Sequence, residues 1–370
     1  MPRIVQKRRS LSSIIVFEID SPHSFLTLSI IMSALLRFSC ALLSVLPTLS
    51  FASPQAPQSL DVAGIAARQV SSSSTPWPID NDAVNTVVEW DHYSIFVNGK
   101  RLFLFTGEMH YWRIPVPEMW TDILQKIKAA GFTGFTFYSS WGYHAFNSTS
   151  LDFETGAHDI ARFFELAKEI GLYIIFRPGP YINAEANAGG FPLWLCTGAY
   201  GTLRNNGSAY TEAYTPYLNA FAEAAKPYLI SNGGNGILYQ IENEYGDQWI
   251  GDPIDRVPDL TASAYMQNME NLARAAGVNI PFDFNNPNEY TYSWSNEFAP
   301  GAEGNTDLSG LDSYPSCWTC DLSQCASTNG PYVPYKVVDY YSYFLSVGNE
   351  TQPNFLPEFQ GGSFNPWGGR

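Results

Sequence analysis

The feature that most constrains the fold of this chain is a regular alternation between short apolar runs and longer amphipathic segments. Runs of β-branched and aromatic residues between turn residues are typical of buried strands, and apolar residues three and four apart are typical of helices. The predicted strands span residues 102–111, 132–139, 172–181, 236–244, 280–285, 308–315 and 353–359. The predicted helices span residues 117–131, 158–171, 211–229, 261–277 and 335–347. This pattern indicates the α/β class.

The order of these segments also predicts how the strands are arranged. Strands separated by helices pair in parallel, and each helix crosses over one face of the sheet. Seven such strands favour a (β/α)8 TIM barrel over residues 89–370, because no Gly-rich phosphate motif of a doubly wound nucleotide fold follows any of them. We find no eighth strand, so we expect a barrel truncated before the eighth strand. Ahead of the barrel, Asn98-Gly99 between two β-rich runs predicts a hairpin.

The residues before the barrel divide into two parts. We interpret residues 1–52 as an upstream extension and a secretory signal peptide, because residues 32–53 combine a basic residue, an apolar run and a small-residue end. Translation starts either at Met32 or further upstream. An uncleaved membrane anchor is disfavoured, since Arg37 and polar residues interrupt the apolar stretch. Residues 53–88 are rich in Ser, Pro and Ala and are interpreted as a propeptide or linker.

Two further features agree with secretion. Sequons for N-linked glycosylation begin at Asn147, Asn206 and Asn349. The cysteines outside the signal segment are Cys196, Cys317, Cys320 and Cys325. In a secreted chain they favour disulfides, with three possible pairings. The alternative, a zinc site on the last three cysteines, is disfavoured because no histidine or second CxxC pair accompanies them, and we expect no metal. We therefore predict an extracellular glycoprotein.

The charge balance excludes one class of partner. With 20 Lys and Arg against 35 Asp and Glu, the formal net charge is -15. A nucleic-acid-binding protein needs a basic face toward the phosphates, so nucleic acid is not an expected partner. We also expect no stable membrane association. Neutral substrates remain open, and the abundant Trp and Tyr side chains suit sugar rings as well as they suit a core.

Polar side chains gather where the predicted strands end, which is where a TIM barrel carries its active site. The strand-end residues are Glu108, His110, Arg113, Tyr138, Trp141, Arg177, Tyr181, Asn183, Glu185, Asn243, Glu244, Asp312, Tyr314 and Glu358. The set holds no Ser-His-Asp arrangement, histidine-rich metal cluster or phosphate cradle. Carboxylates with amide and aromatic neighbours are what hydrolysis of a glycosidic bond needs, because one acid protonates the leaving oxygen and a second carboxylate meets the developing cation.

Several of these residues also have purely structural interpretations. A single glutamate at a strand end is more often a salt-bridge or capping residue than a catalyst. Glu108 and Arg113 can pair with each other, and His110 can be a satisfied core histidine. The convergence of many such residues on one predicted face is what favours an active site.

The stretch "QIENEYG", residues 240–246, holds two glutamates two positions apart. If the strand runs to Glu244, alternation places Gln240, Glu242 and Glu244 on one face, and Ile241 and Asn243 on the other. We then expect Glu244 at the lip of the barrel and Glu242 one layer deeper, hydrogen-bonded within the barrel.

Four blocks, in order along the chain, resemble glycoside hydrolase family 35, the secreted and lysosomal β-galactosidases. They are "GEMHYWRIPVPEMWTDILQKIKAAGFTGFTFYSSW", "FRPGPYINAEANAGGFPLWL", "GGNGILYQIENEYG" and "LPEFQGGSFNPWGG". The resemblance covers roughly residues 75–370, and the last block is most similar to the fungal members. It implies a retaining, exo-acting (β/α)8 enzyme that uses no cofactor and hydrolyses β-galactosides.

The same resemblance implies roles for individual residues. Glu244 takes the acid/base role, Glu358 is the nucleophile, and Glu242 supports the site. The implied substrate-binding residues are Tyr138, Asn183, Ala184, Glu185, Asn243 and Tyr314. Asn243 would bind the sugar 2-hydroxyl, and retention places the two catalytic carboxyl groups about 5 to 5.5 Å apart.

The chain departs from the family at its C-terminal end, where members continue beyond the seventh strand into further β-rich domains. We therefore expect a catalytic domain that is incomplete. The leading hypothesis is a β-galactosidase catalytic domain. A related β-exo-glycosidase, such as a β-glucosaminidase, is the first alternative. A non-catalytic secreted sugar-binding protein is the second, and the presence of both Glu244 and Glu358 disfavours it.

Overall fold

The computed structural model describes residues 78–245, 260–286, 303–312 and 352–359. Several predictions therefore lie outside the described residues. They are the signal peptide, most of the linker, the helix at 335–347, Tyr314, Asn349 and the cysteines at 317, 320 and 325. No helix among the described residues is long and apolar enough to cross a membrane.

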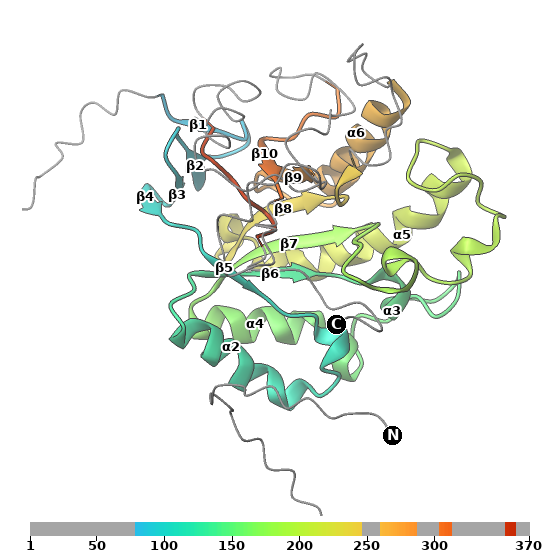
Figure 1. The fold of residues 1–370 in the computed structure, drawn as a ribbon, viewed down its shortest axis with the longest axis horizontal. Coiled ribbons are helices and arrows are strands. Elements are labelled where there is room, and N and C mark those ends of the chain that lie inside the picture. The colour runs from blue at the N-terminus through green and yellow to red at the C-terminus, as the bar shows by residue number, and fades with distance from the viewer. Residues whose placement is uncertain (1–77, 246–259, 287–302, 313–351, 360–370) are drawn as a thin grey trace, which may run out of the picture. The chain divides into compact units, whose positions relative to one another are not determined.

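The centre of the fold is a parallel sheet with the order β10-β9-β8-β7-β6-β5 (Figure 1). Its strands are β5 (Thr106–Glu108), β6 (Gly134–Tyr138), β7 (Tyr173–Gly179), β8 (Gly236–Ile241), β9 (Phe282–Asn286) and β10 (Leu308–Leu311). Each strand pairs with the next one along the chain, whereas a doubly wound sheet reverses direction at a switch point. The fold is therefore a (β/α)8 barrel seen in part, which confirms the predicted fold class. Among the described residues the sheet stays open between β5 and β10.

Four predicted helices are confirmed: α2 (Trp120–Ala129), α4 (Ile160–Ile170), α5 (Ser208–Ala225) and α6 (Leu260–Ala275). The short helix α3 (Trp141–His144) was not predicted. The ends of α4 show why the sequence stops it there. The Asp159 side chain accepts a hydrogen bond from the Arg162 backbone amide at one end, and Gly171 takes a left-handed conformation with φ 80° at the other.

Short 3-10 turns connect these elements. They are η2 (Tyr111–Arg113), η3 (Pro117–Met119), η4 (Gly156–His158), η5 (Asn187–Gly190), η6 (Leu195–Thr197), η7 (Lys226–Tyr228) and η8 (Ile230–Asn232). The first two replace part of the predicted strand and helix around residue 113, so β5 is much shorter than the predicted run 102–111.

A small antiparallel sheet precedes the barrel. Its strands are β1 (Asp80–Asn81), β2 (Val88–Trp90), β3 (Ile95–Val97) and β4 (Lys100–Leu102). The predicted hairpin joins β3 to β4, with Asn98 and Gly99 both at positive φ. Strand β1 lies inside the segment 53–88 that was assigned to the linker. It belongs to the folded part, since Asp80 pairs with Trp90 of β2. Regular structure therefore begins before the expected boundary at residue 88.

Two apolar cores show which end of the barrel is covered. The larger one lies between the sheet and the helices and is dominated by aromatic rings such as Phe137, Phe163 and Phe221. The smaller one joins the antiparallel sheet to side chains near the starts of β7, β8 and β10. The small sheet thus covers the ends where these three strands begin, and the ends where they finish are left for polar side chains.

The prediction of a seventh strand at residues 353–359 is wrong, because the segment forms no regular strand. The segment lies beside β10 in an extended form, and the Phe355 carbonyl accepts a 3.1 Å hydrogen bond from the Leu311 amide. Pro353 and Pro357 have no backbone N–H, so a regular ladder cannot form. Close approach is possible because Gly310 has no side chain: a Cβ there would lie 2.1 Å from Pro357 Cγ.

Candidate active site

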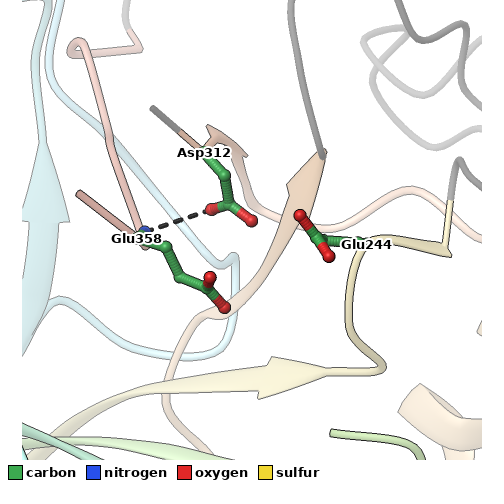
Figure 2. Close-up of side chains that lie close together, drawn as sticks. All are labelled: Glu244, Asp312 and Glu358. Atoms are coloured by element: carbon green, nitrogen blue, oxygen red, sulfur yellow. Dashed lines mark hydrogen bonds between the residues drawn. The ribbon is translucent and has the colours of Figure 1, made fainter. Parts of the chain in front are cut away.

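Three carboxylates from distant parts of the sequence meet at the open end of the sheet (Figure 2). Glu244 follows β8, Asp312 follows β10, and Glu358 lies in the extended segment beside β10. One carboxylate oxygen of each lies within 4.8 Å of one from each of the others. The sequence had placed all three at strand ends, and the structure brings them together.

The end of β8 differs from the predicted alternation. The strand stops at Ile241, and Glu242 and Glu244 both have left-handed backbones, with φ 60° and 45°. These two left-handed residues turn the side chains of Asn243 and Glu244 toward Arg177 and the other carboxylates. The Glu242 side chain points instead to Arg204, in the segment before α5. The prediction that Glu242 and Glu244 share one face is therefore wrong, because alternation holds only while the backbone stays extended.

Glu358 sits in a hydrogen-bonded, positively charged setting. Its Oε1 accepts a 2.7 Å hydrogen bond from the Tyr138 hydroxyl at the end of β6 and a 2.8 Å bond from Arg177 Nη2 on β7. The guanidinium carbon of Arg177 lies 3.9 Å from the centre of the Tyr138 ring. The Glu358 side chain is only 15% exposed, so these donors act on it with little screening by water.

The electrostatics of Arg177 and Tyr138 fit an ionised Glu358. Burial alone would lower the pKa of Arg177, but its electrostatic interactions with Tyr138, Glu358 and Asp312 raise it above the ordinary value. Burial raises the pKa of the Tyr138 hydroxyl well above its usual range. Arg177 is therefore a permanent cation and Tyr138 a neutral hydrogen-bond donor, and both favour the charged form of the carboxylate they touch.

Asp312 has the opposite character. Burial first, and then the negative charges of Glu358 and Glu244, raise its pKa well above the usual range of a carboxyl. Its Oδ1 accepts a 3.1 Å hydrogen bond from the Glu358 backbone amide, and its Oδ2 accepts a 2.6 Å bond from Asn285 Nδ2. Three carboxylates around one guanidinium thus favour the retention of a proton within the cluster.

Two amide side chains connect the cluster. Asn285, on β9, accepts hydrogen bonds on Oδ1 from the Glu244 backbone amide at 3.0 Å and from Gln240 Nε2 at 2.7 Å. Asn243 accepts a hydrogen bond from Arg177 and donates one of 3.5 Å to Glu244 Oε2. Asn285 and Asn243 are buried, so they fix the relative positions of β7, β8 and β9 at the site.

The loop after β7 carries Asn183, Ala184 and Glu185, and all three have positive φ, between 46° and 52°. Arg113 Nη2 donates hydrogen bonds to the carbonyl oxygens of Ala184 at 2.5 Å and of Glu185 at 3.3 Å. A run of left-handed non-glycine residues is strained, and such strain is characteristic of functional loops.

A cavity of about 750 Å³ runs along the open side of the sheet, between β5 and residues 353–359, and reaches this loop. The predicted site residues that line it are Tyr138, Asn183, Ala184, Glu185 and Glu358. Asn243 and Glu244 are not among its lining residues, so the structure divides the predicted site between this cavity and the adjoining carboxylate cluster.

The structural interpretations can also be compared with the geometry. Glu108 pairs with His110 at 2.8 Å, not with Arg113. His110 is buried and its ring stacks on Trp112 with centroids 4.6 Å apart, so it is a satisfied core histidine that also contacts a carboxylate. Asn147 and Asn206 are exposed, which is compatible with their predicted glycosylation. Cys196 is exposed and forms no disulfide among the described residues, which do not include the other three candidate cysteines.

The three carboxylates are close enough to hold a cation. However, Arg177 already supplies a positive charge in direct contact with Glu358, and Asp312 accepts hydrogen bonds on both oxygens. This donor set fits proton transfer among carboxyl groups better than metal coordination.

Three residues of this site were not among the predicted catalytic or substrate-binding residues. Arg177 and Asp312 were recognised only as strand-end residues, and their contacts with Glu358 could not be read from spacing. Asn285 lies one residue before the end of β9, and the strand-end argument applied there would have found it.

Comparisons with known proteins identify the family. A model of the glycosyl hydrolases family 35 matches residues 94–370. The chain is 60% identical over 306 residues to "Probable beta-galactosidase B" of Aspergillus niger and 58% identical over 306 residues to the protein of that name from Penicillium rubens. Each alignment covers 83% of this chain and 30% of the relative, so the chain spans less than a third of the length of these relatives.

Among solved structures, GH5_18 from Streptomyces cattleya aligns with 57% of this chain and 51% of its own, at 15% identity and a TM-score of 0.45. A similarity of that size does not support the fold assignment. The assignment depends on the parallel sheet, in which each strand pairs with the next along the chain, and on the family match.

Proposed function

The chain belongs to glycosyl hydrolase family 35, and from this premise we propose that it carries the catalytic site of a retaining, exo-acting β-galactosidase. The substrate class is a β-galactoside, the nucleophile is Glu358, and the acid/base is Glu244. The observation that carries this proposal is the approach of the two carboxylates, whose oxygens lie within 4.8 Å. An approach this close is compatible with the separation of about 5 to 5.5 Å between carboxyl groups in retaining enzymes.

The different surroundings of the two glutamates support the assignment of roles. Tyr138 and Arg177 both donate to Glu358, which favours its ionised, nucleophilic form. Glu244 receives a hydrogen bond from the neutral amide of Asn243 and faces two other carboxyl groups. The negative charge of Glu358 favours the protonated form of a carboxyl beside it, which is the form an acid catalyst needs at the start of the reaction.

The reaction then follows in two steps. The Glu358 carboxylate attacks the anomeric carbon, the bond from that carbon to the leaving oxygen breaks, and Glu244 gives its proton to that oxygen. In the second step Glu244 takes a proton from water, the water oxygen attacks the same carbon, and the bond to Glu358 breaks. Two inversions give galactose with net retention. During the covalent intermediate, Arg177 and Tyr138 stay in place to receive the departing carboxylate.

The surrounding residues are proposed to bind the sugar. The family resemblance assigns Tyr138, Asn183, Ala184, Glu185, Asn243 and Tyr314 to this task. Asn183 and Glu185 line the cavity beside Glu358, and the amide of Asn243 lies next to Glu244, where it can meet the sugar 2-hydroxyl. We also propose secretion and N-glycosylation at Asn147, Asn206 and Asn349, on the basis of the signal-like segment and the sequons.

The test combines turnover with chemical labelling of the whole chain. We expect hydrolysis of an aryl β-galactoside, abolished by Glu358→Gln and strongly reduced by Glu244→Gln. Glu270→Gln, on α6, is the matched control and should keep full activity. A 2-deoxy-2-fluoro-β-galactoside with a good leaving group should label the peptide that contains Glu358.

Three results would contradict parts of the proposal. Initial release of α-galactose would exclude retention, and labelling of another residue would exclude Glu358 as nucleophile. Hydrolysis of an aryl β-glucosaminide in preference to the galactoside would point to the alternative exo-glycosidase.

A further inference from the structure

One buried guanidinium, that of Arg204, touches both loops that carry the proposed acid/base and sugar-binding residues. Arg204 lies in the segment before α5, outside the carboxylate cluster, and its side chain is 7% exposed. Its partner Glu242 is 1% exposed and lies two residues before Glu244. Neither residue takes part in the proposed chemistry, so their burial as a charged pair calls for another explanation.

The pair has the geometry of a two-point ionic contact. Arg204 Nε donates a 3.1 Å hydrogen bond to Glu242 Oε1, and Arg204 Nη2 donates a 2.6 Å bond to Oε2. The Tyr265 hydroxyl on α6 adds a 2.9 Å bond to Oε1. Parallel bonds of this kind fix orientation as well as distance, which a lysine could not do.

The same two side chains also bind the backbone of Asn243 on both sides. Glu242 Oε2 accepts a 2.8 Å hydrogen bond from the Asn243 amide, and Arg204 Nη2 donates a 2.6 Å bond to the Asn243 carbonyl oxygen. Glu242 and Glu244 flank this residue in left-handed conformations that the chain does not adopt without help. The ion pair therefore stabilises the turn that aims Glu244 at the carboxylate cluster.

On its other side the guanidinium of Arg204 stacks on Tyr181, with 3.9 Å from Cζ to the ring centre. Tyr181 opens the loop that contains Asn183, Ala184 and Glu185. The ring has no room to move toward Gly189, where an added Cβ would lie 1.8 Å from Tyr181 Cε2. Arg204 thus holds the start of the proposed sugar-binding loop while it holds the turn at Asn243.

We propose that Arg204 and Glu242 are positioning residues that couple the acid/base turn to the sugar-binding loop. The proposal rests on the function proposed above. A buried ion pair of this kind adds little net stability but strongly favours one arrangement of the chain over others. Its expected role is to keep the Glu244 carboxyl in reach of the leaving oxygen.

The kinetic test uses the whole chain with the variants Arg204→Met, Arg204→Lys and Glu242→Gln. Misplacement of a catalytic group by about 1 Å can cost about a hundredfold in rate. For Arg204→Met we expect a loss of that order with phenyl β-galactoside, a poor leaving group that needs the acid. With 2,4-dinitrophenyl β-galactoside, whose leaving group needs no proton, the rate of the first step at saturating substrate should fall much less, while the disturbed sugar-binding loop should raise KM on both substrates. Arg204→Lys should recover little of the lost rate, since lysine lacks the planar guanidinium that makes two parallel hydrogen bonds.

A matched control exists elsewhere in the fold. Arg274, on α6, also pairs with an acid, Asp307, and also lies over an aromatic ring, Phe282, at 4.2 Å. Arg274→Met should affect all leaving groups equally or not at all. An equal loss of this saturated rate on phenyl and dinitrophenyl substrates in Arg204→Met would overturn the proposal, because it would show a general structural role.

A second measurement does not depend on turnover. Hydrogen exchange should quicken in Arg204→Met both at residues 242–245 and at residues 181–186, and in Arg274→Met at neither segment. Faster exchange in only one of the two segments would overturn the coupling. If the unsubstituted chain hydrolyses no galactoside, the proposed function fails, while the exchange data still decide whether Arg204 joins the two loops.

Discussion

The backbone amide of Glu358 donates a 3.1 Å hydrogen bond to Oδ1 of Asp312, and this bond attaches the extended segment to the end of β10 (Figure 2). A strand residue would be held by a ladder of backbone bonds, but prolines deny this segment a regular ladder. The position of Glu358 therefore depends on a side chain. Asp312 contributes to the site by placing the glutamate as well as by its charge.

Replacement of Asp312 by asparagine tests that dependence. Both Asp312 oxygens accept hydrogen bonds, from the Glu358 amide and from Asn285 Nδ2. In Asp312→Asn one acceptor becomes a donor that faces another donor. In urea denaturation at about pH 3, where the raised pKa of Asp312 adds no pH-dependent cost, we expect about 1–3 kcal/mol less stability, as for a buried group left without a partner. At neutral pH we expect at least a tenfold lower kcat/KM on an aryl galactoside. A variant with unchanged stability and activity would show that the Glu358 segment is held by other contacts.

The hydroxyl of Tyr138 provides a second test, because it can be removed without loss of the ring that stacks on Arg177. A hydrogen bond to a charged group contributes about 1.5–3 kcal/mol, so Tyr138→Phe should lower kcat/KM by roughly ten- to a hundredfold. The control is Tyr217→Phe. Its hydroxyl is equally buried but donates to the carbonyls of Ser139 and Pro178, so its loss should reduce the melting temperature and leave kcat/KM unchanged. Equal effects of the two variants on kcat/KM would contradict a special role for Tyr138.

Much of the fold could be predicted because it depends on local pattern. The apolar strands and amphipathic helices were recognisable from periodicity, and Asn98-Gly99 marked a turn that the structure contains. The segment at 353–359 could not be classified in this way. Its apolar residues resemble a strand, but Pro353 and Pro357 remove the donors that pairing requires.

The site was predicted less completely, for a physical reason. Strand ends identify which residues can reach the mouth of a barrel, and that argument found Glu244 and Glu358. It could not foresee that two left-handed residues would turn Glu242 away from Glu244, since β-strand alternation was assumed to continue. Nor could it find Arg204, whose contacts with Glu242 and Tyr181 link segments far apart in sequence.

His144 predicts a loss of stability in acid. Burial lowers its pKa from 6.5 to about 4. The neutral ring is satisfied on both sides, because Nδ1 donates to the Asp152 carbonyl at 2.5 Å and Nε2 accepts from the Tyr111 hydroxyl. Between pH 6.5 and 4 the unfolded chain binds a proton that the folded chain does not, so stability falls as pH falls, by roughly 3 kcal/mol in total. Urea denaturation of His144→Gln across this range should lack that slope, and an unchanged slope would assign it to other groups.

Asp283 predicts the opposite slope. It lies on β9 with its side chain fully buried, and neither carboxyl oxygen has a hydrogen-bond partner among the described residues. Burial raises its pKa from 3.8 to about 8, and Arg177 offsets only part of that shift. Between pH 4 and 8 the folded chain therefore holds a proton that the unfolded chain has released. Stability should fall as pH rises through this window, by about 1.4 kcal/mol per pH unit.

The substitution Asp283→Asn removes the titration and keeps the shape of the side chain. At pH 7 the variant should be more stable than the unsubstituted chain by roughly 4 kcal/mol, which is the pH-dependent cost accumulated above pH 3.8. At about pH 3, below both pKa values, Asp283 is mostly neutral in both states and the difference should nearly vanish. Urea denaturation of both proteins at about pH 3, 5.5 and 7 measures this directly. A gain that stays constant across the three pH values would mean that the substitution acts through packing, and a loss at pH 7 would mean that the buried acid is ionised and paired with Arg177.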